Sequence, residues 1–149
     1  MMKQQRTFEQ IEEHYKIERR LADRLRHSSR QERQHLYTSL YDELFRRVSH
    51  HPQLVQKTSS QETRARVDYE MRNLRPFLGR ETTFLEVGPG DCALSLEVAK
   101  HVRKVYAVDV SSEITKDLDP PPNFELVLSN GASIPVPARS IDVVYSNQL

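Results

Sequence analysis

Apolar and polar residues alternate with a helical period through the first half of the chain. In the first such segment, apolar residues recur every three or four positions and are interrupted once, by Glu18. The apolar members are Phe8, Ile11, Tyr15, Ala22 and Leu25. This spacing places them on one face of a helix, so the pattern predicts an amphipathic helix over residues 8–25.

Two more helices are predicted before residue 80. Ser28 and Ser29 suit the N-cap of the second helix, and His51-Pro52 ends it. Its apolar stripe is wider and consists of Leu36, Tyr37, Leu40, Tyr41, Leu44, Phe45 and Val48. The third helix is expected to start at 58–60 and to close at Gly79. Its buried side would carry Val67, Met71, Leu74, Phe77 and Leu78.

From residue 82 onward, short apolar runs replace the helical period. They lie near 82–87, 104–109, 123–129 and 141–146, and they are typical of buried parallel strands. A short helical pattern follows the first run, so strands and helices alternate as in α/β proteins. We therefore expect a helical cap region over 1–80 and an α/β domain over 81–149.

The most informative segment joins the first strand to the helix after it. Gly88 and Gly90 turn the chain tightly there, and a helix N-terminus with unpaired amide donors follows. Such a loop cradles a small ligand. The segment also fits the dinucleotide fingerprint, through Gly88, Gly90 and Ala93, with Asp109 about twenty residues further on. By itself this match is weak.

Three neighbouring residues argue against a dinucleotide. A pyrophosphate would lie close to Glu86 and Asp91, whose negative charges would repel it. Pro89 also removes one amide donor from the loop. S-adenosylmethionine, which carries a sulfonium, an amino group and a ribose diol, suits these acids better. The loop therefore favours S-adenosylmethionine as the cofactor.

Four segments in the second half resemble motifs of the class I, Rossmann-like S-adenosylmethionine-dependent methyltransferases. Residues 86–91 (Glu-Val-Gly-Pro-Gly-Asp) resemble motif I, and 105–111 resemble the second strand, which ends in an acid. Residues 123–132 resemble the third strand with its adenine-contacting loop, and 134–146 resemble the run into the fourth strand. The motifs occur in the family's order and at its spacing over residues 82–149. The resemblance implies a parallel sheet with strand order 3-2-1-4.

The resemblance also implies which residues bind the cofactor. Gly88 and Gly90 would let the backbone approach the methionine moiety, and Glu86 would contact its amino end. Asp109 would accept hydrogen bonds from both ribose hydroxyls, because a carboxylate can accept two charge-assisted bonds. Ser146 would lie at the end of the fourth strand, beside the methyl group.

The adenine ring would contact the loop after the third strand. Val110 and Ile114 would pack on its face or would be ordinary core residues. Asn130 stands where the family usually has Asp, and its side-chain carbonyl would accept a hydrogen bond from the adenine amino group. The backbone amide of Gly131 or Ala132 would face a ring nitrogen. No catalytic residue is identified, and no metal ligand is expected.

Simpler interpretations exist for several of these residues. Glu86 could be a solvated acid at a strand end, and Asp109 could cap a helix that starts near residue 111. The pair Asn130-Gly131 is also typical of a plain turn. In the family, tyrosines from N-terminal helices can reach the cofactor, and Tyr37 and Tyr41 are the candidates. Both lie on the apolar stripe, so core packing is favoured for them.

The charge distribution and the composition limit the kinds of partner that we expect. Residues 1–80 hold 17 Lys and Arg against 11 Asp and Glu, a net of +6, and 81–149 hold 5 against 10, a net of −5. Basic and acidic residues alternate along the helices, so a solvated face is favoured over a nucleic-acid surface. No apolar run is long enough for a membrane span, and residues 1–6 lack the apolar core that a signal peptide has.

The cysteine and histidine residues bear on the cellular compartment of the protein and on whether it binds a metal ion. A single cysteine fits a reducing cytoplasm, and Cys92 is expected to be a packing residue. The six histidines show no zinc spacing with cysteine. His50 and His51 are expected to be a pair at a helix C-terminus.

A class I domain has seven strands, and only four are found here. We therefore expect the cofactor-binding half of an S-adenosylmethionine-dependent methyltransferase, truncated after the fourth strand, with a small-molecule acceptor. The alternative is a non-catalytic protein that binds S-adenosylmethionine or is completed by a partner. Without the last three strands, the fourth strand would be an exposed edge, open to a second copy or to another chain.

Overall fold

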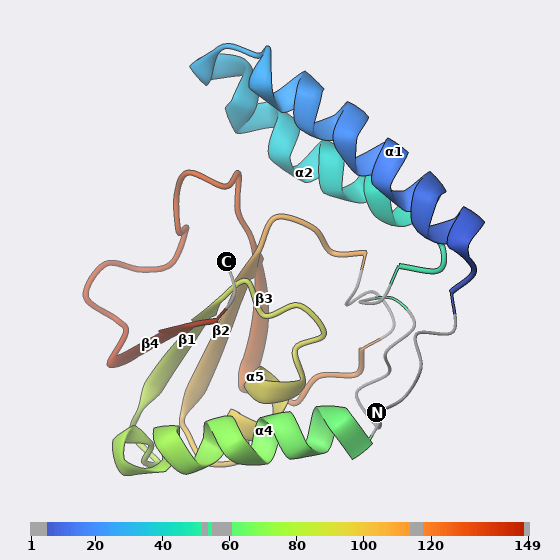
Figure 1. The fold of residues 1–149 in the computed structure, drawn as a ribbon. Helices are drawn as coiled ribbons and strands as arrows, with labels where there is room; N and C mark the ends of the chain where they lie inside the picture. The colour runs from blue at the N-terminus through green and yellow to red at the C-terminus, as the bar shows by residue number, and fades with distance from the viewer. Residues whose placement is uncertain (1–5, 52–53, 55–60, 114–117, 148–149) are drawn as a thin grey trace.

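The computed structural model describes residues 6–51, 54, 61–113 and 118–147, and it shows a helical pair above a parallel sheet (Figure 1). The helices are α1 (Phe8–Arg26), α2 (Arg30–Arg47), α4 (Gln61–Leu74), the short 3-10 helix η1 (Arg75–Phe77) and α5 (Ala93–Val98). The strands are β1 (Thr83–Val87), β2 (Lys104–Asp109), β3 (Phe124–Leu128) and β4 (Val143–Ser146). Within the described ranges, no helix combines the length and apolarity that a bilayer span requires.

The sheet confirms the predicted α/β, Rossmann-like topology. Its order is β3-β2-β1-β4, and every neighbouring pair is parallel. Each predicted strand is present, with bounds within two residues of those expected. The central strand β1 is buried along almost its whole length, and Phe84 has no exposed surface. Burial on both faces explains the apolar run of β1. The expectation of buried strands is wrong for β4 and for the end of β3, because Val144 is 64% exposed and Leu128 is 50% exposed.

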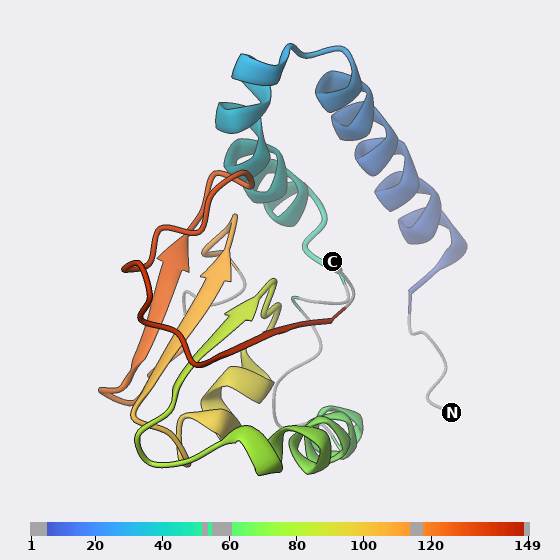
Figure 2. The ribbon, with the colours of Figure 1, turned by 90° about the vertical axis from the view of Figure 1, so that its left-hand side faces the viewer.

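Helices α4 and α5 lie on the same face of the sheet (Figure 2). Val67, Met71 and Leu74 of α4 are buried in the core there, as predicted. Phe77 is not, because the chain turns into η1 before it, and its side chain is 65% exposed. The predicted start of this helix at 58–60, like Pro52, lies outside the described residues.

Helices α1 and α2 form a pair whose ends follow their sequences. Thr7 caps α1 and Ser29 caps α2, each in a reciprocal capping box with the side chain three residues later. The two helices bury a small cluster of their own, made of Ile17, Leu21, Leu40, Leu44 and Val48.

The predicted buried face of α1 is wrong. Phe8 is 80% exposed and Tyr15 is 60% exposed, whereas Ile17 and Leu21 are buried. The reason is that α1 buries its apolar side chains against α2, where a single row spaced by four residues suffices to fill the contact. Of the predicted stripe, Leu25 packs against this cluster, whereas Phe8, Ile11 and Tyr15 are exposed.

Helix α2 is docked on the loops at the carboxyl ends of the strands. In Figure 2 the arrows of β1, β2 and β3 point towards it. The hydroxyl of Ser111 donates to Oδ1 of Asp42 on α2 at 2.6 Å. Thr38 of the same helix donates to the backbone oxygen of Ser129 at 3.4 Å. The helical pair is thus fixed over the strand ends.

Gly131 makes this docking close. Its φ is +76°, and a Cβ placed on it would lie 2.9 Å from the ring of Tyr37. Replacing Gly131 by Ala should lower the free energy of unfolding by about 2–5 kcal/mol, because left-handed strain of about 1–2 kcal/mol adds to overpacking of about 1–3 kcal/mol. Urea denaturation would measure the change. Gly79→Ala is the matched control, since its Cβ would meet only Oγ1 of Thr82, at 3.7 Å. Equal stability of the two variants would contradict the close packing.

Candidate cofactor site

A cavity of about 820 Å³ lies between α2 and the carboxyl ends of β1, β2 and β3. One wall is aromatic and comes from α2, with Tyr37, Tyr41 and Phe45. The opposite side comes from the strand ends and the loops that follow them. Its apolar members are Val87, Val108, Val110, Ala132 and Ile134, and its polar side chains are Asp109, Ser129 and Ser133. A mostly apolar cavity with a few polar groups is typical of a small-ligand site.

The glycine loop after β1 forms part of the cavity wall. Gly88 and Gly90 both line it, and both have positive φ, at 69° and 55°. The amide of Gly88 donates to the backbone oxygen of Val108, which ties the loop to β2. Two residues without Cβ in a left-handed conformation let the backbone approach whatever fills the cavity.

Asp109 is the acidic residue of the cavity wall, at the end of β2. Its Oδ1 accepts hydrogen bonds from the amides of Val110 at 2.7 Å and Ser111 at 3.3 Å. Burial raises the pKa of this carboxyl, and hydrogen bonds from the amides of Ser111, Val110 and Gly90 oppose the rise. One carboxylate oxygen is therefore anchored by the backbone, as a capping residue would be, while the side chain still lines the cavity.

Glu86 lies beneath the glycine loop rather than in the cavity wall. It is 5% exposed, so the interpretation as a solvated acid is wrong. The hydroxyl of Ser95 on α5 donates to its Oε2. Burial raises the pKa of Glu86 to about 7, against the effect of that hydrogen bond. Because the pKa of Glu86 lies near 7, its carboxyl ionises readily when a cation binds beside it.

The loop after β3 has a different structure from the one that the resemblance implied. Oδ1 of Asn130 accepts hydrogen bonds from the amides of Ala132 and Ser133 and from the hydroxyl of Ser133, each at 3.0 Å. The amide of Gly131 donates to Oγ of Ser129. The groups expected to meet adenine thus bond within the turn. Asn130 is exposed and is not among the residues that line the cavity, which favours the plain-turn interpretation.

Of the other predicted cofactor-binding residues, some line the cavity and some do not. Val110 and Gly131 line the cavity. Ser146 ends β4 beside Val87, but it is exposed and does not line the cavity. Ile114 lies outside the described residues. Cys92 is buried, and burial raises the pKa of its thiol, so it is a packing residue, as predicted.

The prediction that Tyr37 and Tyr41 pack in the core is wrong. Tyr41 is 43% exposed and, like Tyr37, lines the cavity instead of packing in a core. Leu40 and Leu44 meet α1, and the tyrosines lie one position further round the helix. The signal was the width of the stripe, which is greater than one helical neighbour needs.

The fold and this cavity define a Rossmann-like domain with a ligand site at the carboxyl ends of its parallel strands. Residues 85–149 match the family described as methyltransferase domain. This match confirms the resemblance to class I S-adenosylmethionine-dependent methyltransferases for that part of the chain.

Further comparisons add little. A search of curated proteins found no match. Among solved structures, the chain is similar to precorrin 8w decarboxylase from Methanobacterium thermoautotrophicum, at 25% identity and a TM-score of 0.39. The similarity covers 44% of this chain and 38% of the length of that structure.

Proposed function

We propose that the cavity binds S-adenosylmethionine and that the chain is the cofactor-binding half of a methyltransferase. The observation that carries this proposal is the position of Asp109. Its carboxylate lies in a wall shared with Gly88 and Gly90 and faces an aromatic wall from α2. The two hydroxyls of a ribose diol each donate a hydrogen bond, and a carboxylate can accept both. An adenine ring packs on apolar and aromatic surface. The residues present fit both requirements.

Each part of the cavity has a task in this proposal. Asp109 accepts hydrogen bonds from the ribose hydroxyls, and its anchored Oδ1 fixes the direction of the carboxylate. The glycine loop makes room for the methionine end, and Glu86 beneath it accepts from the amino group, directly or through water. Tyr37 and Tyr41 cover the ligand and exclude water. The bound cofactor would supply an electrophilic methyl group on a sulfonium.

A small-molecule acceptor is favoured over a nucleic acid. The basic residues of α1 and α2 are interspersed with acids, and some of them form ion pairs: Glu43 pairs with Arg24 at 2.5 Å and with Arg47 at 2.8 Å. Lys16 likewise pairs with Glu12 at 2.6 Å. Such paired charges do not form the continuous basic patch that phosphate backbones require. We keep as part of the proposal that the edge strand β4 pairs with a second copy or a partner chain.

Calorimetric titration tests the cofactor assignment. The full chain should bind one S-adenosylhomocysteine and should not bind NADH measurably under the same conditions. The reason is that the loop lacks an amide donor at Pro89 and that the carboxyls on either side of it, Asp91 and the buried Glu86, do not favour a pyrophosphate. Tighter binding of NADH than of S-adenosylhomocysteine would refute the proposal.

A further inference from the structure

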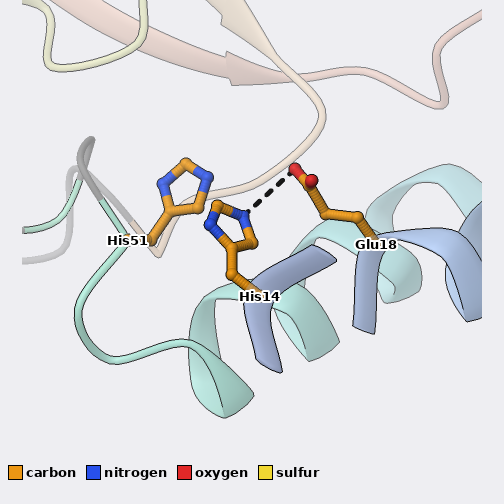
Figure 3. A group of neighbouring side chains, drawn as sticks. All are labelled: His14, Glu18 and His51. Carbon is orange, nitrogen blue, oxygen red and sulfur yellow. Dashed lines mark ion pairs between the residues drawn. The ribbon is translucent and has the colours of Figure 1, made fainter. Parts of the chain in front are cut away.

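A cluster of ionisable side chains that do not line the cavity lies where α1 runs past the segment that follows α2. His14 and Glu18 are one turn apart on α1, and His51 comes from the other segment (Figure 3). Nε2 of His14 lies 3.1 Å from Oε1 of Glu18. One ligand atom from each of the three residues lies within 4.8 Å of the other two. The fold thus gathers a donor set whose members are far apart in sequence.

Both imidazoles are shielded from solvent. His51 is 9% exposed, and the side chain of His14 is 12% exposed. Nε2 of His14 is buried and makes no hydrogen bond, because its approach to Glu18 is an ion-pair contact without hydrogen-bond geometry. A buried nitrogen without such a bond is costly unless something binds it.

We propose that His14, Glu18 and His51 bind a divalent transition-metal ion of the Zn²⁺ type. Two imidazole nitrogens and one carboxylate oxygen form a donor set that Zn²⁺ favours, with a fourth position left for water. Tetrahedral bonds to zinc separate ligand atoms by roughly 3.3 Å, so the widest pair here must close by rotation of its side chains. Glu18 is half exposed and can move. The ion fastens α1 to the segment after α2, beside a hydrophobic cluster of only a few residues.

Arg6 works against the metal ion. Its Nη1 donates a hydrogen bond to Nδ1 of His14 at 2.9 Å. An Nδ1 that accepts from arginine leaves the ring proton on Nε2, which the ion must then displace. The positive charge of Arg6 also repels the ion. Replacing Arg6 by Gln removes the charge and offers a carbonyl that can accept from Nδ1–H, the arrangement that commonly supports metal-bound histidine.

Calorimetry of the untagged full chain with ZnCl₂ tests the proposal. One Zn²⁺ per chain should bind, and MgCl₂ should give no heat of binding, because Mg²⁺ prefers oxygen ligands. Loss of an outer partner alone commonly costs about 10- to 100-fold in affinity, so Glu18→Gln, His14→Ala and His51→Ala should each weaken binding at least about tenfold. Arg6→Gln should strengthen it. His35→Ala changes an exposed histidine of α2 and should leave the affinity unchanged.

Glu18→Gln and Arg6→Gln keep the test decisive even where His51→Ala does not fold, because neither changes a fully buried side chain. Absence of saturable Zn²⁺ binding by the folded chain would overturn the proposal. The proposal would also be overturned if neither Glu18→Gln nor Arg6→Gln changed the affinity for Zn²⁺, since the ion would then bind at other groups.

Discussion

Replacing Asp109 by Asn should weaken the binding of S-adenosylhomocysteine by about 2–3 kcal/mol, or roughly 30- to 150-fold. Asparagine keeps the oxygen that accepts from the amides of Val110 and Ser111, so the end of β2 should keep its shape. It loses the negative charge, and it replaces the second acceptor by an NH₂ donor. The ribose hydroxyls would then lose charge-assisted hydrogen bonds. Calorimetric titration measures the affinity, and circular dichroism checks the fold.

Asp142→Asn provides the matched control for this experiment. Oδ2 of Asp142 accepts a hydrogen bond from the amide of Thr83, at the opposite end of β1 from the cavity. Its substitution changes the net charge by the same amount and also touches a strand end. It should leave the affinity for S-adenosylhomocysteine unchanged. Equal affinities for the Asp109→Asn and Asp142→Asn variants would remove Asp109 from the site.

Replacing Glu86 by Gln should stabilise the free protein at pH 8 by about 1–3 kcal/mol. Burial raises the pKa of Glu86 from 4.5 to about 7 in the folded chain. The folded state therefore holds this proton to higher pH than the unfolded state does. The stabilisation that comes from binding this proton is fully present below pH 4.5. It is lost as the pH rises towards 7, at about 1.4 kcal/mol for each pH unit. Glutamine has no charge to bury and escapes this loss.

Urea denaturation between pH 4.5 and pH 8 measures the difference. The free energy of unfolding should fall with rising pH in the wild type more steeply than in Glu86→Gln. Glu125→Gln, at an exposed position of β3, should retain the wild-type profile. The Glu86→Gln variant should also bind S-adenosylhomocysteine more weakly, because glutamine keeps a carbonyl acceptor but has no negative charge to pair with the amino group of the ligand. A variant as dependent on pH as the wild type would show that Glu86 is not buried in the folded chain.

A large part of the sheet could be predicted from sequence, because its signals are local. The apolar runs fix the strands, and Gly88 and Gly90 mark the turn that brings the chain from β1 into α5. Asp109 follows a strand that lies beside β1, so its place at the same edge follows from parallel topology. These residues line the cavity as expected.

The parts that could not be predicted depend on what packs against what. The exposed face of α1 carries Phe8 and Tyr15, and nothing in its spacing distinguishes that face from a buried one. The side of α2 that meets the cavity depends on the Asp42 to Ser111 bond, which joins positions 69 residues apart. The same holds for His14 and His51, which only the pairing of α1 with the segment after α2 brings together.

Asn130 shows a limit of the motif itself. The resemblance aligned it with an acid that binds adenine, and its oxygen was expected to face the ligand. In the fold this oxygen holds the turn through Ala132 and Ser133 instead. A short amide next to glycine bonds readily to the backbone two or three residues on, and this local preference prevails here.

A crystal structure of the full chain with S-adenosylhomocysteine is the most direct measurement of the central claim. The adenosine should occupy the cavity under Tyr37 and Tyr41, with both ribose hydroxyls on the Asp109 carboxylate and the amino acid end along the Gly88–Gly90 loop. Density for the ligand elsewhere, or a cavity closed by side chains of α2 while the ligand is in excess, would contradict the account.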